Sequence, residues 1–278
     1  MTRATGGTAL AAFLCPDGFA PPGLRAIARE ARILPEVGRA AAHGLADRRH
    51  RRGTPYAAPR PARVGQPVLL VPGFMAGDRS LSWMARELRA QGYRTHRSGI
   101  HANVGCTQTV LDAIERRAEA IAIRRGSPVL LVGHSLGGML ARGLAGRRPD
   151  LVAGLVTLGS PVQAPGAHHR LLTVGVGTLT RLAAAGLPGV MAGDCVRGDC
   201  ARLAFEATAA PLAPHVPWTA VYSRRDGVVD WRACTHPRAR GVEVTTSHCG
   251  MAVDPTVVGT VLTALAAACT PVPVAVPA

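Results

Sequence analysis

The hydrophobic pattern changes near residue 67, where short apolar runs begin to alternate with segments of helical periodicity. Apolar runs of about 4–8 residues bounded by turn residues are typical of buried strands. Strands are predicted at residues 68–71, 93–97, 129–132, 151–158, 218–222 and 242–245. Helices are predicted at residues 80–90, 107–125, 139–145 and 257–269. This alternation predicts an α/β fold, with a doubly wound, mostly parallel sheet and helices on both of its faces.

The first 66 residues follow a different pattern. Residues 22–45 are rich in arginine and carry apolar side chains at helical spacing, with an interruption at Pro35. Such a segment either packs on the main domain or lies on a membrane surface. Residues 54–67 contain four prolines, which predicts an extended connector. We therefore divide the chain into an N-terminal helical and extended appendage, residues 1–66, and a main domain, residues 67–278.

The amino-acid composition says more about the expected binding partners than about the fold. At 47% hydrophobic residues, the chain can bury a sizeable core. The net charge of +15 first suggests nucleic-acid binding, but all 32 basic residues are arginine, which together with abundant Ala, Gly and Pro indicates a codon-composition bias. The arginine cluster at residues 48–52 lacks the interleaved aromatic side chains of a single-strand binding groove. We expect no nucleic-acid partner, while peripheral contact with an anionic membrane stays open.

The cellular compartment is only weakly indicated. No apolar run reaches the roughly 18 residues that a membrane-spanning helix needs, and no clear cleavage site follows the apolar stretch at residues 9–14. The expected localisation is cytoplasmic, with membrane association or export as alternatives. Among the seven cysteines, Cys195 and Cys200 could form a disulfide, as could Cys234 and Cys249. In a reducing cytosol all would be thiols, and no oligomeric state is indicated.

The most specific motif is a G-x-S-x-G pentapeptide that directly follows the apolar run at residues 129–132 and precedes a helical segment. In a strand–turn–helix context this motif presents a nucleophilic serine on a sharp turn. Ser135 is the predicted nucleophile, and Gly133 and Gly137 leave room for the turn because they lack a Cβ. The adjacent His134 is interpreted as structural, with its ring expected to point away from the site.

An activated serine needs a base that takes its proton and a carboxylate that orients the base. Open α/β sheets carry their sites beyond the C-terminal ends of the strands. Asp226 follows the strand at residues 218–222, and His248 follows the strand at residues 242–245. We predict Asp226 as the acid and His248 as the base. Asp230 is the alternative acid, and the competing interpretation of Asp226 is a plain Asp-Gly turn.

The negative charge that develops on a substrate oxygen requires two backbone N–H donors. One predicted donor is Leu136, which follows the nucleophile at a helix N-terminus. The second lies in the loop after the first strong strand, where Gly73 permits a tight turn. Phe74 N–H is the predicted donor, with Met75 as second choice. Both side chains could instead simply fill the core.

The chain resembles the α/β-hydrolase superfamily from about residue 66 to residue 268, and most nearly its bacterial lipase/esterase-like members. Four motifs carry the likeness in this order: VPGF at residues 71–74, GHSLGG at 133–138, YSRRDGVV at 222–229 and SHCGM at 247–251. The resemblance implies a serine hydrolase of lipid metabolism that cleaves carboxylic esters through an acyl-enzyme on Ser135, without metal or organic cofactor. It departs from the pattern at Pro72, where many lipases have histidine.

The substrate depends on residues 163–217, where such enzymes insert a small helical cap or lid. Residues 171–187 are largely apolar, and Arg181 is the one charged residue among them. A mobile apolar lid would suit an apolar acyl substrate, and a helix packed permanently on the sheet is the alternative. His168 and His169 are adjacent, but no further histidine, cysteine or carboxylate follows at the spacing of metal ligands. We therefore expect no metal site there.

Three other functions remain open on this fold. An acyltransferase or a thioesterase would use the same three residues, and a binding protein could keep the fold without catalysis.

Overall fold

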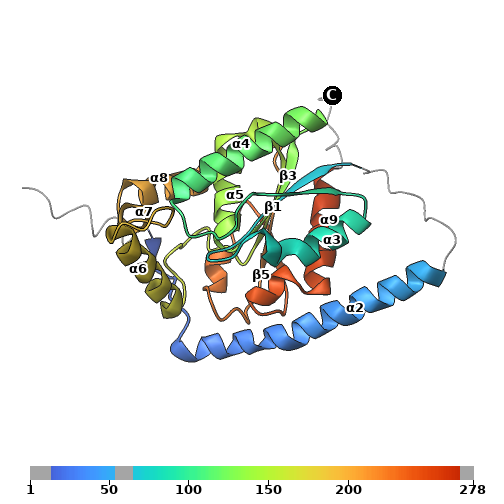
Figure 1. Ribbon diagram of the computed structural model, residues 1–278, viewed down its shortest axis with the longest axis horizontal. Helices are drawn as coiled ribbons and strands as arrows, with labels where there is room; N and C mark the ends of the chain where they lie inside the picture. The colour runs from blue at the N-terminus through green and yellow to red at the C-terminus, as the bar shows by residue number, and fades with distance from the viewer. Residues whose placement is uncertain (1–13, 54–64, 270–278) are drawn as a thin grey trace, which may run out of the picture.

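A parallel sheet forms the centre of the molecule (Figure 1). The structure, a computed structural model, describes residues 14–53 and 65–269. Within these residues the sheet has six strands in the order β2-β1-β3-β4-β5-β6. The strands are β1 (Pro67–Val71), β2 (Arg94–Arg97), β3 (Val129–His134), β4 (Val152–Leu158), β5 (Trp218–Tyr222) and β6 (Arg240–Glu243). The α/β fold predicted from alternating strands and helices is confirmed.

Helices cover both faces of the sheet, because alternate side chains of each strand point to opposite sides and both sides must be buried. One face packs against α3 (Ser82–Ala90) and α9 (Pro255–Ala268). The other packs against α4 (Thr107–Arg125) and α5 (Leu136–Arg147), and α8 (Asp199–Ala209) packs on these two helices. Short 3₁₀ segments are η2 (Asp78–Leu81), η3 (Pro149–Leu151), η4 (Trp231–Cys234) and η5 (Cys249–Ala252). In β1, Val68 and Leu70 enter one core, and Leu69 and Val71 enter the other.

The two edge strands differ slightly from their predicted bounds. β2 begins one residue later than expected, and β6 begins and ends two residues earlier. Both strands pair on one side only and are largely polar, so the hydrophobic pattern marks them weakly. As a result, Val244 and Thr245 lie beyond the strand, in the segment that leads to His248.

The N-terminal segment forms η1 (Leu24–Arg32) and α2 (Ile33–Gly53), which runs along one side of the molecule (Figure 1). Pro35 lies in the first turn of α2, where proline is tolerated because the N–H groups there have no intrahelical acceptor. The first half of α2 packs beside η5 and α9, and Arg39 forms an ion pair with Asp254. The appendage is therefore in contact with the domain over this half.

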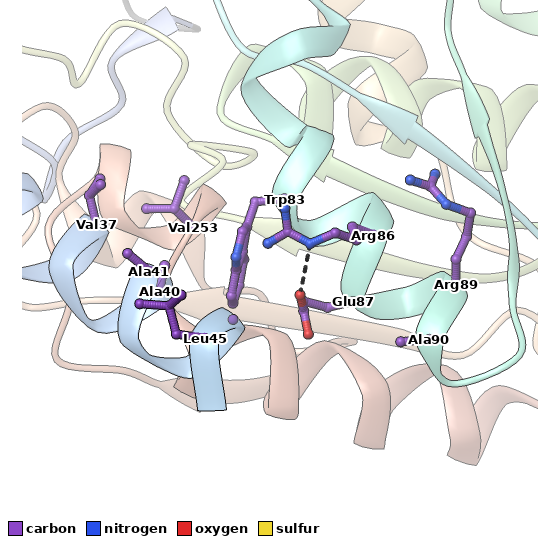
Figure 2. A pocket seen from close by; sticks show the side chains of 11 residues that line it. Val37, Ala40, Ala41, Leu45, Trp83, Arg86, Glu87, Arg89, Ala90 and Val253 are labelled. Carbon is purple, nitrogen blue, oxygen red and sulfur yellow. Dashed lines mark hydrogen bonds and ion pairs between the residues drawn. The ribbon is translucent and has the colours of Figure 1, made fainter. Parts of the chain in front are cut away.

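A hollow of about 810 Å³ lies between α2 and α3. Figure 2 shows Val37, Ala41 and Leu45 of α2 on one side and Trp83 of α3 on the other, with Arg86 bonded to Glu87 at the edge. No residue predicted for the catalytic site lines this hollow. It lies where the N-terminal appendage packs on the domain, apart from the predicted catalytic residues.

Residues 163–217 contain α6 (Arg170–Ala184), α7 (Asp194–Arg197) and α8. α8 packs on α5 and belongs to the helix layer of the domain. α6 has no buried residue and exposes Leu171, Val174 and Leu182 to solvent. In this segment, α8 is thus part of the helix layer of the domain, whereas α6 is an apolar helix on the surface. Among the described residues, no helix is both long and apolar enough to span a membrane.

Candidate active site

Ser135 lies on a sharp turn between β3 and α5. Its φ of 53° and ψ of −124° are strained for a residue with a side chain. The two neighbouring glycines permit this turn, because an added Cβ at Gly133 would collide with the backbone of Gly137, and one at Gly137 would collide with the carbonyl of Val71. The structure therefore gives the pentapeptide the strand–turn–helix context that its sequence predicts.

Asp226 and His248 lie against each other beyond the ends of β5 and β6. Asp226 Oδ2 is 2.6 Å from His248 Nδ1, and both side chains are buried. The other carboxylate oxygen, Oδ1, accepts the backbone N–H groups of Val228 and Val229, each at 2.8 Å. These bonds fix the carboxylate so that one oxygen faces the imidazole.

Asp230, the alternative acid, has different partners. It caps the N-terminus of η4 by accepting the N–H of Arg232, pairs with the guanidinium of the same residue, and accepts the N–H of Ala20. Among the described residues, the structure brings Asp226 and not Asp230 to His248.

Ser135 and His248 both lie next to the end of β4 and the residue that follows it. Ser135 N–H donates to the carbonyl of Leu158, and the next residue, Gly159, lies so close to the His248 ring that an added Cβ would be 3.1 Å from Nδ1. Among the described residues, no hydrogen bond joins the Ser135 hydroxyl to His248. The structure thus places the two residues in the same small region without a direct bond between them.

His134 packs against the predicted base. The two ring centroids are 4.9 Å apart, and His134 Nε2 donates to the carbonyl of His248 at 3.0 Å. The ring therefore contacts the base residue and does not point away from it, which corrects the expectation from the sequence. Burial, with a smaller effect from His248, lowers the pKa of His134 to about 4, so His134 is neutral at pH 7.

His248 has a different electrostatic environment. Burial alone lowers its pKa, but the charge and hydrogen bond of Asp226 and the charge of Glu30 act in the opposite direction. The net result is a pKa above the ordinary histidine value of 6.5. His248 is thus a stronger base than an isolated imidazole, and neutral His134 adds no positive charge beside it.

The loop after β1 is held by Asn103. The buried Asn103 side chain donates to the carbonyl of Pro72 at 2.9 Å, and its backbone accepts the N–H of Met75 at 3.1 Å. Met75 adopts a left-handed φ of 59°. Within the described part of the chain, Phe74 N–H has no acceptor, and Leu136 N–H begins α5, where no intrahelical acceptor exists. Phe74 and Leu136 therefore offer unused donors, whereas the Met75 donor is occupied.

Glu30, from η1, joins the loops that carry Asp226 and His248. One carboxylate oxygen accepts Gly227 N–H at 2.9 Å and His248 N–H at 3.0 Å, and the other accepts Cys249 N–H at 3.0 Å. Sequence reasoning missed this residue. The only available signal was a carboxylate within an otherwise arginine-rich segment, which names no partner.

Glu36 supports the same region from α2. It is almost fully buried, and its two oxygens accept the backbone N–H and the hydroxyl of Ser247, the residue before His248. Two glutamates of the N-terminal segment thus hold the backbone on both sides of the base, and this segment contributes directly to the geometry of the site.

A mostly apolar cavity of about 510 Å³ opens beside Ser135. Phe74 and Leu136 line it near the serine, and Leu172 and Val176 of α6 line it from the superficial helix. The arrangement thus places a serine hydroxyl, a histidine–carboxylate pair and two N–H donors at the edge of an apolar chamber.

Neither cysteine pair considered from the sequence forms a disulfide. Cys234 is buried and contacts the carbonyl of Asp230, whereas Cys249 is exposed. The neighbouring imidazoles of His168 and His169 bond to backbone carbonyls, and within the described residues neither belongs to a metal-ligand cluster.

Comparison with known proteins identifies the fold. A family model described as alpha/beta hydrolase fold matches residues 66–194, which include Ser135 but not Asp226 or His248. Comparison with curated protein sequences gave no match.

Solved structures show the same fold at low identity. Bacillus licheniformis lipase BlEst2 is 16% identical, with a TM-score of 0.57, over 77% of this chain and 96% of that one. The putative non-heme bromoperoxidase BpoC of Mycobacterium tuberculosis H37Rv is 19% identical, with a TM-score of 0.51, over 74% and 94%. A structure from a study of the metagenome-derived lipolytic enzymes LipS and LipT is 16% identical, with a TM-score of 0.50, over 74% and 94%. With its parallel sheet, its serine turn and its match to the family model over residues 66–194, this chain has the alpha/beta hydrolase fold.

Proposed function

We propose that the protein is a serine hydrolase of carboxylic esters, with Ser135 as nucleophile, His248 as general base and Asp226 as the residue that orients the base. The observation that carries this proposal is the 2.6 Å contact between Asp226 Oδ2 and His248 Nδ1, beside a strained serine turn. A plain Asp-Gly turn needs no histidine partner, so the turn alone does not account for the contact.

The proposed reaction proceeds in two halves. His248 Nε2 takes the hydroxyl proton as Ser135 Oγ attacks the ester carbonyl carbon, and the N–H groups of Phe74 and Leu136 stabilise the oxyanion. The alcohol leaves with the proton from His248, and the acyl group stays on Ser135. Water, activated by the same base, then releases the acid and restores the hydroxyl. The missing hydrogen bond between Ser135 and His248 forms when substrate binds, because such bonds are often long in ligand-free sites.

The apolar cavity favours an ester with an apolar acyl group. α6 lies over this cavity with Leu172 and Val176 turned toward it, while Leu171 and Val174 are exposed. A superficial helix with apolar residues on both sides suits a lid that shifts when an apolar substrate approaches. We therefore assign residues 163–217 the role of a cap, in which α6 is the movable part and α8 is fixed to the helix layer of the domain.

Fluorophosphonate labelling tests the nucleophile. Ser135 Oγ should attack phosphorus and expel fluoride, which leaves a stable phosphonyl adduct that peptide mass spectrometry assigns to Ser135. Prior incubation with an apolar ester should slow labelling. A folded protein that stays unlabelled, or that is labelled at another serine, would contradict the proposal.

A series of nitrophenyl esters tests the acyl preference. kcat/KM should rise from acetate to medium-length acyl chains, because each methylene buried in the cavity contributes about 0.8 kcal/mol at most. A protein that cleaves only acetate would exclude the apolar acyl substrate but not the serine mechanism. Added alcohol that captures the acyl group ahead of water would indicate an acyltransferase.

Replacing Glu30 by glutamine should lower kcat by about 10- to 100-fold, because a displacement of about 1 Å in a catalytic group can cost 10²-fold. The amide oxygen can still accept two N–H groups. The amide nitrogen then faces the N–H of Cys249, and because both groups are donors they repel each other. The loop that carries His248 must shift.

The same variant should change the pH profile. Loss of the Glu30 charge lowers the pKa of His248, so the base stays neutral to lower pH and the acid limb of kcat/KM moves down in pH. Glu206→Gln, a variant of an exposed carboxylate paired with Arg202, should leave both measurements at the wild-type value. An acid limb at the wild-type position would rule out the electrostatic role of Glu30.

A further inference from the structure

Three thiols meet beside the apolar cavity. Cys106 precedes the first turn of α4, Cys195 lies in α7 and Cys200 lies in the first turn of α8. All three sulfur atoms lie within 4.8 Å of one another, and the Sγ atoms of Cys106 and Cys200 are 3.3 Å apart. Cys200 is buried, while the other two are half-buried. The cluster joins the start of α4 to the cap segment, two parts of the chain that are distant in sequence.

The surrounding backbone fixes this cluster. Met191 N–H donates to the carbonyl of Val104 at 2.7 Å, which fastens the segment before Cys195 to the segment before Cys106. The carboxylate of Asp194 accepts the N–H groups of Asp199 and Cys200 at 3.0 and 3.3 Å. The thiols therefore meet because two loops are bonded to each other, and not because flexible side chains happen to point the same way.

The spacing suits a tetrahedral metal centre. Zinc binds thiolate sulfur at about 2.3 Å, so two sulfur ligands of one ion lie about 3.8 Å apart. A disulfide requires about 2.0 Å and uses only two sulfur atoms, which would leave the third thiol of this cluster unused. Cys106 and Cys200 lie at the N-terminal ends of α4 and α8, where the helix dipoles favour the thiolate that a metal requires.

We propose that Cys106, Cys195 and Cys200 form a binding site for a zinc-class divalent ion, with a fourth ligand from solvent. The ion ties α7 and α8 to α4 at the rim of the cavity, where Thr107 and Cys195 both contribute to the wall. It takes no part in the proposed reaction at Ser135. The site would stabilise the fixed part of the cap while α6 remains free of it.

Metal titration of the full chain, reduced and then freed of metal by a chelator, tests the site directly. Zn²⁺ should bind with a stoichiometry of one per chain in competition with a chromophoric chelator. Co²⁺ should give a thiolate-to-metal charge-transfer band that Zn²⁺ then removes. Bound Zn²⁺ should also raise Tm, because an ion that binds only the folded state stabilises it. A folded, reduced protein that binds neither ion would overturn the proposal.

Three single variants, Cys106→Ser, Cys195→Ser and Cys200→Ser, locate the ligands. Each should weaken Zn²⁺ binding by more than about 100-fold, because even an outer-shell partner contributes about 10- to 100-fold. Cys269→Ser, at the end of α9 on the opposite face of the sheet, should bind Zn²⁺ as the wild type does. If all three variants bound Zn²⁺ normally, the ion would bind elsewhere and the proposed site would be wrong.

Thiol counting separates the metal from a disulfide. Protein purified without reductant should retain three alkylatable thiols at these positions once the metal is removed. A Cys106–Cys200 disulfide found by peptide mapping, with no metal in the reduced protein, would overturn the proposal in favour of a redox link. Because none of these measurements uses ester turnover, they are independent of the proposed function.

Discussion

Ser135→Ala should reduce kcat for an apolar nitrophenyl ester by about 10⁴- to 10⁶-fold, because no other group can form the acyl-enzyme. The N–H donors of Phe74 and Leu136 remain in place, so the residual rate should stay above that of the uncatalysed reaction. KM should change little, since the hydroxyl adds almost nothing to binding in the apolar cavity.

Stability should be preserved in this variant. Within the described residues, the Ser135 hydroxyl has no hydrogen-bond partner, and alanine is no more strained than serine at a φ of 53°. Ser82→Ala, a change of an exposed serine in α3, is the matched control and should leave both kcat and Tm as in the wild type. If Ser135→Ala folded normally and retained even a tenth of the activity, Ser135 could not be the nucleophile.

The local parts of the site could be predicted from sequence because they lie within one strand, turn and helix. Ser135, Gly133 and Gly137 form a continuous motif, and the apolar run before it marks a strand buried on both faces. Asp226 and His248 required one more rule, that sites lie beyond the carboxyl ends of parallel strands. The choice between Asp226 and Asp230 rests on which carboxylate faces the imidazole, and a turn sequence does not contain that information.

The supporting residues could not be predicted because their partners are backbone groups far away in the chain. Glu30 contacts N–H groups more than 190 residues later, and Asn103 bonds to the backbone of the loop that carries Phe74. Backbone donors have no sequence signature. The sequence likewise suggested Cys195 and Cys200 as a cysteine pair, because they are close along the chain. The fold brings Cys106 to them from a distant element.

Asp226→Asn should lower kcat by about 10⁴-fold, because it should force His248 into the wrong tautomer. In the wild type, Asp226 Oδ1 accepts two backbone N–H groups, from Val228 and Val229. The amide oxygen of asparagine must occupy this position, since an NH₂ group there would meet two donors. The amide nitrogen then faces His248 Nδ1 and donates to it.

With Nδ1 as acceptor, the neutral imidazole carries its proton on Nε2 and cannot take the proton of Ser135. Protein stability should fall only slightly, because both backbone bonds to Val228 and Val229 are kept. Asp230→Asn is the control: it weakens the cap of η4 and the pair with Arg232, at a cost of about 1 kcal/mol in the free energy of unfolding, and should leave kcat nearly unchanged. Two measurements decide the assignment, kcat and the His248 proton signals in NMR, which should show the Nδ1–H bonded to Asp226 in the wild type and lost in Asp226→Asn. If Asp230→Asn lost activity while Asp226→Asn kept it, the roles of the two carboxylates would be reversed.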